Sequence, residues 1–259
     1  FEVLTASEVV NTHGRLGLNS IDVKTPQGLR QIQASGLGVS GGWNPNIHLT
    51  CHQRGRPEWD AGLSAFVPSS DLPKALFVAG AANGQMTTAA AIQDAVKIAT
   101  KIASDFGRKA KSLAVPKTSD ESASLTPFWY VTGTERGWVD QQNDVTVKDI
   151  KLAHQENFRS VEHLKRYTTL GMATDQGKTS NVLGLAIMAH TAGQSIPDTG
   201  TTIYRPPYSP TAIGVFAGRS RDMDFRPIRK TPSHKWAEEQ GAVFVEVGMW
   251  YLGSGKRVC

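Results

Sequence analysis

The chain has 259 residues, of which 39% are hydrophobic and 20% are charged, proportions that exclude a collagen-like or disordered class. Lysine and arginine outnumber aspartate and glutamate by 28 to 23, which gives a net charge of +5. Because no block of about five like charges concentrates this excess, the sequence predicts no nucleic-acid-binding or membrane-binding tail. Two cysteines, Cys51 and Cys259, are too few for a disulfide framework, so we expect a reducing, cytoplasmic environment.

No stretch reaches the roughly 18 apolar residues of a membrane-spanning helix, and the best candidate, Val182 to Ala189, is far shorter. The start of the chain does not have the pattern of a signal peptide. Because the chain begins with Phe1 and ends at Cys259 shortly after an apolar stretch, without a closing element, we expect a piece of a longer polypeptide or a processed one.

The first part of the chain predicts strands followed by one long helix. Short runs separated by glycine and proline predict a meander with strands at residues 2–4, 8–12, 20–24 and 30–33. Two buried strands are predicted within residues 36–46 and 75–79, and each leads into a glycine-containing turn. From about Thr88 to Asp105, apolar residues recur every three or four positions, which predicts an amphipathic helix.

The second of these buried strands, the turn at residues 80–84 and the helix together indicate a possible ligand site. In α/β folds this succession presents backbone N–H groups to a nucleotide phosphate. The alternative is a tight connection between strand and helix that binds no ligand.

The second part of the chain predicts a small helical region. Helices are expected at about residues 147–156, 161–169 and 181–192. Thr146 and Ser160 are capping residues for the first two, while Gly171 and Gly193 are expected to end the last two.

Less regular segments surround this helical region. Residues 107–137 predict a linker, and residues 195–230, rich in Pro, Thr and Arg, predict an extended connector. A short amphipathic helix at 233–240 and a strand at 243–247 follow.

The loop before the third helix has the chemistry of an anion site. Gly177-Lys178-Thr179 is similar to the end of a P-loop, but five residues instead of four separate Gly171 from Gly177, and no buried strand precedes the loop. A glycine, a lysine, two hydroxyls and a helix N-terminus still favour a phosphate-bearing ligand. The alternative is an ordinary capped helix with a surface lysine.

The remaining reactive residues form no recognisable constellation. His48 and His52 lie near Cys51, which is weak evidence for zinc because no further ligands cluster with them. No Gly-x-Ser-x-Gly elbow occurs, so serine-hydrolase chemistry has no support. We therefore predict no catalytic residue and no metal site, and the residues alone predict an α/β nucleotide-binding region joined to a small helical unit with an anion loop.

Several segments resemble known families. Val-Ser-Gly-Gly-Trp-Asn-Pro at 39–45 and Phe-Val-Ala-Gly-Ala-Ala-Asn-Gly at 77–84 resemble the two late dinucleotide-domain motifs of pyridine nucleotide-disulfide oxidoreductase-type flavoproteins. Residues 140–181, and above all 165–181, resemble the α subunit of heterotetrameric sarcosine oxidase. Residues 231–250 resemble the start of the folate-binding, aminomethyltransferase-like domain of that subunit.

The resemblance implies an α/β fold class, with the C-terminal part of a two-dinucleotide-binding, Rossmann-like flavoprotein domain followed by a small helical domain. It divides the chain into four parts: a dinucleotide-binding domain of NAD/FAD type at 1–110, a linker at 111–137, a helical FMN-contacting domain at 138–195, and a connector with the start of the folate domain at 196–259.

Two departures from the wider families bear on the cofactors. Disulfide-oxidoreductase-type flavoproteins carry an aspartate after the glycine of the second motif, whereas Ala81 here cannot accept a hydrogen bond from a flavin ribityl chain; the resemblance therefore implies NAD at this site. The helical unit also resembles the iron–sulfur domain of bacterioferritin-associated ferredoxins. Gln142 and Thr174 stand where cysteines are expected, so this unit cannot hold a cluster.

The resemblance implies two sets of cofactor-binding residues. Those expected to contact FMN are Arg166, Tyr167, Thr168, Thr169, Gly171, Met172, Thr174, Gln176, Gly177, Lys178, Thr179, Ser180 and Asn181. Those expected to contact NAD are Gly41, Gly42, Trp43, Gly80, Ala81, Ala82, Asn83 and Gly84. Lys178 and the N–H groups near Thr179 and Ser180 would neutralise the FMN phosphate, and Arg166 or Lys165 would add positive charge.

The implied activity is oxidative demethylation of sarcosine to glycine with hydrogen peroxide and formaldehyde, or 5,10-methylenetetrahydrofolate when tetrahydrofolate is present. FMN would be shared with a β subunit that holds it covalently and also carries FAD, and γ and δ subunits would complete the complex. No nucleic-acid or membrane partner is implied. The rivals are a subunit of a related oxidase or dehydrogenase for N-methylglutamate, octopine or proline, and a non-catalytic scaffold.

Overall fold

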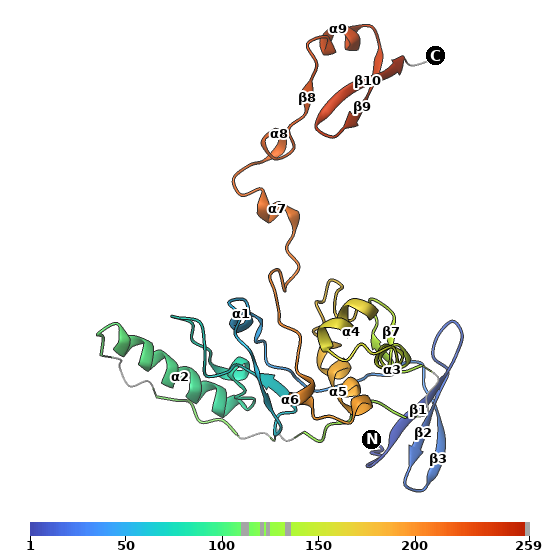
Figure 1. Ribbon diagram of the computed structural model, residues 1–259, viewed down its shortest axis with the longest axis vertical. Coiled ribbons are helices and arrows are strands. Elements are labelled where there is room, and N and C mark those ends of the chain that lie inside the picture. Colours follow the sequence, from blue (N-terminus) through green and yellow to red (C-terminus); the bar gives the residue numbers. More distant parts are fainter. Residues whose placement is uncertain (110–113, 120–121, 123–124, 133–135, 257–259) are drawn as a thin grey trace. The chain divides into compact units, whose positions relative to one another are not determined.

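The computed structural model describes residues 1–109, 114–119, 122, 125–132 and 136–256, with only the backbone of Met223, Phe225 and Lys256. Its contacts divide the chain into two compact units, Phe1–Ser209 and Pro210–Cys259, which are described separately (Figure 1).

The first unit begins with an antiparallel three-stranded sheet in the order β1-β2-β3. Its strands are β1 (Glu8–His13), β2 (Ser20–Thr25) and β3 (Gly28–Gln33). These three predicted strands are confirmed, but residues 2–4 do not form the fourth one. The pairing of Glu8 with Lys24 already reaches the end of β2, so the sheet offers residues 2–4 no neighbour there.

The two buried strands expected within residues 36–46 and 75–79 do not form. Val39 is 85% exposed and Trp43 83% exposed, and no strand of the described residues pairs with either segment. A strand that is apolar on both faces needs neighbours to satisfy its backbone and cover its side chains, and these segments have none here. The elements found around them are short: α1 (His48–Cys51), β4 (Glu58–Asp60) paired with β5 (Ala65–Val67), and the 3₁₀ turn η1 (Gly80–Asn83).

The long predicted helix is confirmed as α2 (Thr88–Asp105). The Thr87 side chain caps its N-terminus by accepting a hydrogen bond from the Ala90 backbone N–H at 3.2 Å. Local sequence signals therefore suffice to define this helix, although none of its residues is buried.

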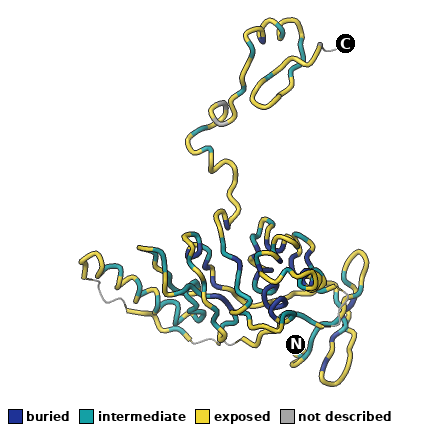
Figure 2. Tube along the Cα trace, viewed as in Figure 1, coloured by how far each residue is buried: buried dark blue, intermediate teal, exposed yellow. Residues whose placement is uncertain are grey.

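The core of the first unit lies around three helices, as the burial colouring in Figure 2 shows. They are α3 (Val147–Gln155), α4 (Val161–Thr168) and α5 (Asn181–Ala192), preceded by the hairpin of β6 (Trp138–Asp140) with β7 (Val145–Thr146) and followed by the short α6 (Ile196–Thr199). Ile47 and Phe66 also belong to this core, so the region before α2 packs against the helices.

The predicted N-terminal caps of α3 and α4 are confirmed, but one predicted helix end is not. Thr146 and Asp149 form a capping box at α3, and Ser160 caps α4. However, α4 ends at Thr168 because Thr169 adopts a left-handed conformation with φ 62°, so Gly171 is not its terminator. Gly193 ends α5 as expected.

The second unit contains α7 (Ile213–Phe216), α8 (Asp222–Phe225), β8 (Arg229–Lys230), α9 (His234–Glu239), β9 (Ala242–Val247) and β10 (Trp250–Lys256). The last predicted helix and strand are confirmed as α9 and β9. The expectation of no closing element is wrong, because β10 pairs antiparallel with β9 and parallel with β8. The fold is thus a mixture of helices and mainly antiparallel sheets, and the Rossmann-like assignment stays a prediction.

Candidate functional site

The loop between α4 and α5 has an unusual backbone. Thr169, Gly171, Gln176 and Gly177 have positive φ values of 62°, 66°, 53° and 75°. Two of these residues are not glycine and have a conformation that costs them free energy. Such a loop needs fixed contacts from its surroundings, and two sets of contacts provide them.

The first set is the Asn181 side chain, which is packed against both glycines of the loop. A Cβ atom added to Gly171 or to Gly177 would lie 2.2 Å from Asn181 Oδ1. The resemblance implies that FMN contacts both of these glycines. In the structure, the side chain that approaches them is Asn181, which is 5% exposed.

The second set is the turn between β6 and β7. The buried Asp140 carboxylate accepts hydrogen bonds from the backbone N–H groups of Gln142 at 2.9 Å, Asn143 at 3.2 Å and Gly171 at 2.8 Å. Asn143 Nδ2 donates to the Thr169 carbonyl at 2.8 Å, and Gln142 Oε1 accepts from the Asp175 N–H at 3.1 Å. The turn therefore holds the loop at three points, a role that sequence spacing alone does not indicate.

The N–H groups expected to bind a phosphate are mostly used within the loop. Gly177 N–H donates to Asp175 Oδ1 at 3.1 Å, and Lys178 N–H donates to the Asp175 carbonyl at 3.3 Å. The N–H groups of Ser180 and Asn181 donate to the Gly177 carbonyl at 3.3 and 2.9 Å. The N-terminus of α5 therefore presents few donors to an anion.

The Lys178 ammonium group is also engaged. Its Nζ atom donates to the Tyr208 carbonyl at 2.9 Å and lies 3.9 Å from the centroid of the Tyr208 ring. The His48 ring also stacks on the Tyr208 ring, with 4.4 Å between the two ring centroids. Burial, with the nearby His52 and Lys178, lowers the pKa of His48, which favours its neutral form in this stack.

Behind this stack, residues 203–208 return to the helical core. The Glu162 carboxylate on α4 accepts from the Ile203 backbone, and the Cys51 thiol interacts with the Tyr204 backbone. Tyr204 packs edge-on against Tyr208 at 4.9 Å, and burial raises the pKa of its hydroxyl well above the usual value. The sequence predicts only a connector for this segment, yet it forms a wall of the site.

Two adjoining cavities lie along this wall, and we call them together the basic groove. One, of about 160 Å³, is lined by Lys165, Met172, Gln176, Ile203, Tyr204, Arg205 and Tyr208. The other, of about 360 Å³, is lined by Cys51, His52, Arg54, Glu162, Arg166, Ile203 and Arg205. Ile203 and Arg205 belong to both cavities and join them.

The charges of the groove are unbalanced. Glu162 is the single acidic residue among the described residues that line it, and its carboxylate pairs with Arg166 at 2.6 Å. Within the part of the chain that the structure describes, neither Lys165 nor Arg205 forms an ion pair. Burial lowers the pKa of Lys165, Glu162 opposes this shift, and the adjacent Arg205 lowers the pKa further. The groove thus brings cationic groups close to one another without enough carboxylates.

Some of the residues predicted to contact FMN line the basic groove, and others lie outside it. Arg166, Met172 and Gln176 line the groove. Tyr167 does not: its ring stacks on Phe158 at 4.4 Å and its hydroxyl donates to Glu156.

The other predicted FMN residues are located as follows. Thr168 and Thr169 donate their hydroxyls to backbone carbonyls, and Thr179 donates to Asp175 Oδ2 at 3.1 Å. Thr174 is exposed, and Ser180 is buried with no hydrogen-bond partner for its hydroxyl among the described residues.

The predicted NAD residues lie in two surroundings. Gly41, Gly42 and Trp43 are exposed, whereas η1 contains residues 80–83 and ends at Gly84. Asp94 of α2 accepts from the Gly80 N–H at 3.0 Å and from Asn83 Nδ2 at 3.2 Å. Because a carboxylate already occupies the Gly80 N–H, this turn does not favour a phosphate at that position, and NAD binding there remains a prediction.

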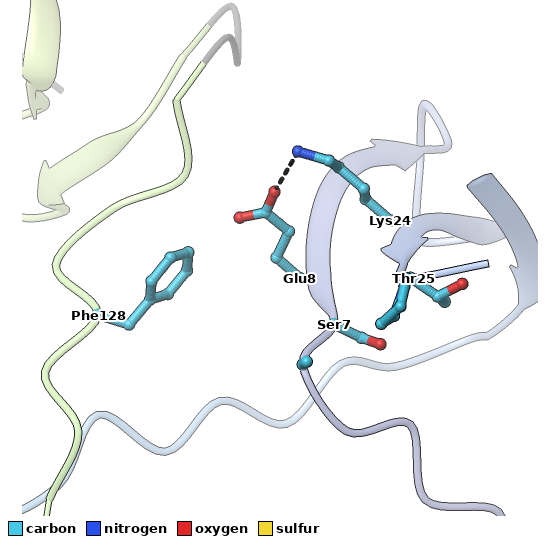
Figure 3. A pocket seen from close by; sticks show the side chains of 7 residues that line it. Ser7, Glu8, Lys24, Thr25 and Phe128 are labelled. Atoms are coloured by element: carbon cyan, nitrogen blue, oxygen red, sulfur yellow. Dashed lines mark hydrogen bonds and ion pairs between the residues drawn. The ribbon is translucent and has the colours of Figure 1, made fainter. Parts of the chain in front are cut away.

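A further cavity, of about 460 Å³, lies at the end of the first sheet (Figure 3). Glu8 and Lys24 form an ion pair of 3.1 Å at this cavity, and Phe128 faces them from another segment. Its charges neutralise each other, and none of the predicted site residues lines it. No described helix is both long and apolar enough to cross a bilayer, and no described group of three or more His, Cys, Asp and Glu residues is placed to hold a metal ion.

Comparisons with known proteins identify relatives of the chain. A family model described as the sarcosine oxidase A3 domain matches residues 134–219, the part that contains the loop and most of the groove. The chain is 41% identical over 249 residues to the sarcosine oxidase alpha chain of Rhizobium meliloti, and 39% identical over 233 residues to that of a Corynebacterium strain, P-1. These matches cover 95% and 85% of this chain, but 25% and 24% of the relatives.

More distant matches exist in sequence and in structure. One of the opine oxidase subunits of Rhizobium meliloti is 24% identical over 204 residues, which cover 72% of this chain and 44% of that protein. L-proline dehydrogenase from P. horikoshii aligns in structure with a TM-score of 0.64 at 16% identity, over 81% of this chain and 44% of the other. This last likeness concerns the fold alone.

The chain spans about a quarter of the length of the sarcosine oxidase alpha subunits that it matches. Its identity to them extends along almost its whole length, and the A3 family match includes the loop with the unusual backbone. Over almost its whole length, the chain is therefore similar to a segment of sarcosine oxidase alpha subunits.

Proposed function

We propose that this chain contributes to a multi-subunit, flavin-dependent sarcosine oxidase, in which it holds part of a cofactor. The observation that carries the proposal is the basic groove, because its wall lies within the segment that matches the family model and three of its cations, Lys165, Arg205 and Arg54, form no ion pair among the described residues. The similarity to named alpha subunits supports the same assignment.

The reaction we propose for the complex is oxidative demethylation of sarcosine to glycine, with hydrogen peroxide and either formaldehyde or 5,10-methylenetetrahydrofolate as products. A bound flavin supplies the electron transfer in such a reaction. This chain supplies binding and electrostatics: the cationic side chains of Lys165 and Arg205 attract an anionic group, and Asp140 and Asn181 keep the loop in one conformation.

The finer assignments are proposals of the same kind. FMN would lie against the loop and be shared with a β subunit that carries FAD, and γ and δ subunits would complete the complex. NAD would bind near Gly41 and Gly80, and tetrahydrofolate in a domain that begins near Thr231. The cations of the groove fit an anionic cofactor at the loop, whereas Asp94 disfavours a phosphate at Gly80.

The test is the absorption spectrum of the purified complex that contains this chain, recorded before and after anaerobic addition of sarcosine. Flavin bands that bleach with sarcosine, together with FMN released only after digestion of a partner subunit, would support the proposal. Flavin bands that sarcosine leaves unchanged would contradict the proposed substrate.

The second candidate is a subunit of a related secondary-amine oxidase, which the similarity to the opine oxidase chain favours. Titration of the same anaerobic sample with octopine, proline or N-methylglutamate distinguishes the two. Bleaching by one of these amines and not by sarcosine would favour the second candidate, and a complex without flavin would leave only a scaffold.

A further inference from the structure

The loop and the groove differ in what they offer to an anion. The loop N–H groups of Gly177, Lys178, Ser180 and Asn181 donate within the loop, and the Lys178 ammonium group donates to Tyr208. An anion at the N-terminus of α5 would have to displace these bonds. In contrast, the groove contains cations that form no ion pair among the described residues.

Three cationic side chains from three separate segments converge on the groove. Lys165 comes from α4, Arg205 from the returning wall, and Arg54 from the residues after α1. Burial is the main cause that lowers the pKa of Lys165, Glu162 opposes this shift, and the nearby Arg205 lowers the pKa further. An anion bound beside both cations would favour the ammonium form of Lys165.

A further polar side chain lies in the same groove. His52 Nε2 is a buried atom without a hydrogen-bond partner among the described residues, and His52 lines the cavity that also contains Arg54. A buried polar atom without a partner is costly, and a ligand atom that pairs with it is stabilising. Arg205, which lines both cavities, has the planar guanidinium that binds phosphate oxygens in pairs.

We propose that the basic groove is a binding site for a phosphate monoester, recognised by Lys165 and Arg205 at the junction of the two cavities and by His52 and Arg54 beyond it. The proposal rests on the proposed function only where FMN is taken as the source of the phosphate. A free phosphorylated metabolite would use the same chemistry. This places the phosphate away from Thr179 and Ser180, where the sequence predicts it.

The experiment uses the full chain and three probes: FMN, riboflavin and inorganic phosphate. FMN and riboflavin share the flavin ring and differ by the phosphate, so the ratio of their dissociation constants, measured by flavin fluorescence, isolates the contribution of the phosphate. We expect FMN to bind at least tenfold more tightly than riboflavin, because charge-assisted hydrogen bonds would hold its phosphate.

Variants then show which side chains provide the phosphate's contribution to FMN binding. Lys165→Gln and Arg205→Gln should each reduce FMN affinity about tenfold and leave riboflavin affinity unchanged, whereas Lys165→Arg should retain most of the FMN affinity. The matched control is Lys148→Gln, which removes the same charge from an exposed position of α3 outside the groove. Arg205→Gln lies outside any helix, so it keeps the proposal testable if Lys165→Gln does not fold.

The outcomes are distinct. Equal affinity for FMN and riboflavin, or an equal loss with Lys148→Gln, would overturn the proposal. Competition between inorganic phosphate and FMN would support it and indicate a site open to other phosphorylated compounds; selective FMN binding that phosphate does not compete with would support it with FMN as the source. Failure of sarcosine to bleach the flavin of the complex would overturn the proposed substrate and leave the phosphate site intact.

Discussion

The helices α3, α4 and α5 bury apolar residues against one another, whereas the 18-residue α2 buries none. Ile150 of α3 and Leu164 of α4 are 0% and 1% exposed, and both belong to one cluster. Along α2, the apolar positions are only partly covered. A helix is thus defined by its own sequence but is stabilised by its neighbours.

The largest expected difference between the two regions is in the cost of removing a buried side chain. Ile150→Ala should lower the free energy of unfolding by about 3–4 kcal/mol, because the side chain is fully enclosed. The same change in α2, Ile102→Ala, should cost less than about 1 kcal/mol, because Ile102 is partly exposed. Urea unfolding measures both, and equal losses would mean that α2 is as well covered as α3.

A smaller effect is expected at the loop glycines. Gly177→Ala should cost about 3 kcal/mol, because the new Cβ would lie 2.2 Å from Asn181 Oδ1 in addition to the strain of φ 75°. Gly193→Ala is the matched control: φ is 66°, but no atom lies within 4 Å of the new Cβ, so about 1 kcal/mol is expected. Similar losses in unfolding free energy would show that the Asn181 side chain can move away from the new Cβ atom at little cost.

Two aspartates at hairpin turns, Asp140 at the turn between β6 and β7 and Asp60 at the turn between β4 and β5, allow a comparison with a smaller expected effect. Asp140 and Asp60 each accept hydrogen bonds from the two N–H groups of their own turn, but only Asp140 also accepts one from Gly171. Asp140→Ala should therefore cost about 2–3 kcal/mol in unfolding free energy, against about 1 kcal/mol for Asp60→Ala. Equal costs would mean that the bond to the loop contributes nothing.

Local signals in the sequence predict part of the fold. Caps at Thr146 and Ser160 determine where α3 and α4 begin, and the apolar periodicity of α2 predicts that helix. The strands expected within residues 36–46 and 75–79 require neighbours that the described residues do not supply, so their apolar runs are not sufficient.

The sequence likewise predicts some residues of the candidate site and misses others. Loop residues Arg166, Met172 and Gln176 are predicted to be near a cofactor and line the groove. Arg205 and His52 are missed because they reach the groove from distant segments. For the wall formed by residues 203–208, the sequence offers one signal, which is the cationic Arg205 within a proline-rich segment.

The smallest effect expected is on the pH dependence of phosphate binding. Burial, together with Arg205 and against the effect of Glu162, lowers the pKa of Lys165 below that of an ordinary lysine. The ammonium form exists below that pKa, so FMN affinity should be constant near neutral pH and fall about tenfold as the pH rises through it. Titrations of FMN and riboflavin between about pH 7 and 10 would check this, and a parallel loss for riboflavin would exclude Lys165 as the cause.

The most direct measurement is an experimental structure of the proposed complex, determined in the presence of FMN. We predict that phosphate oxygens lie within hydrogen-bonding distance of the Arg205 guanidinium and the Lys165 ammonium group, while Lys178 still contacts Tyr208. A phosphate bound instead at the N-terminus of α5, with Lys178 turned away from Tyr208 toward it, would contradict the proposed phosphate site.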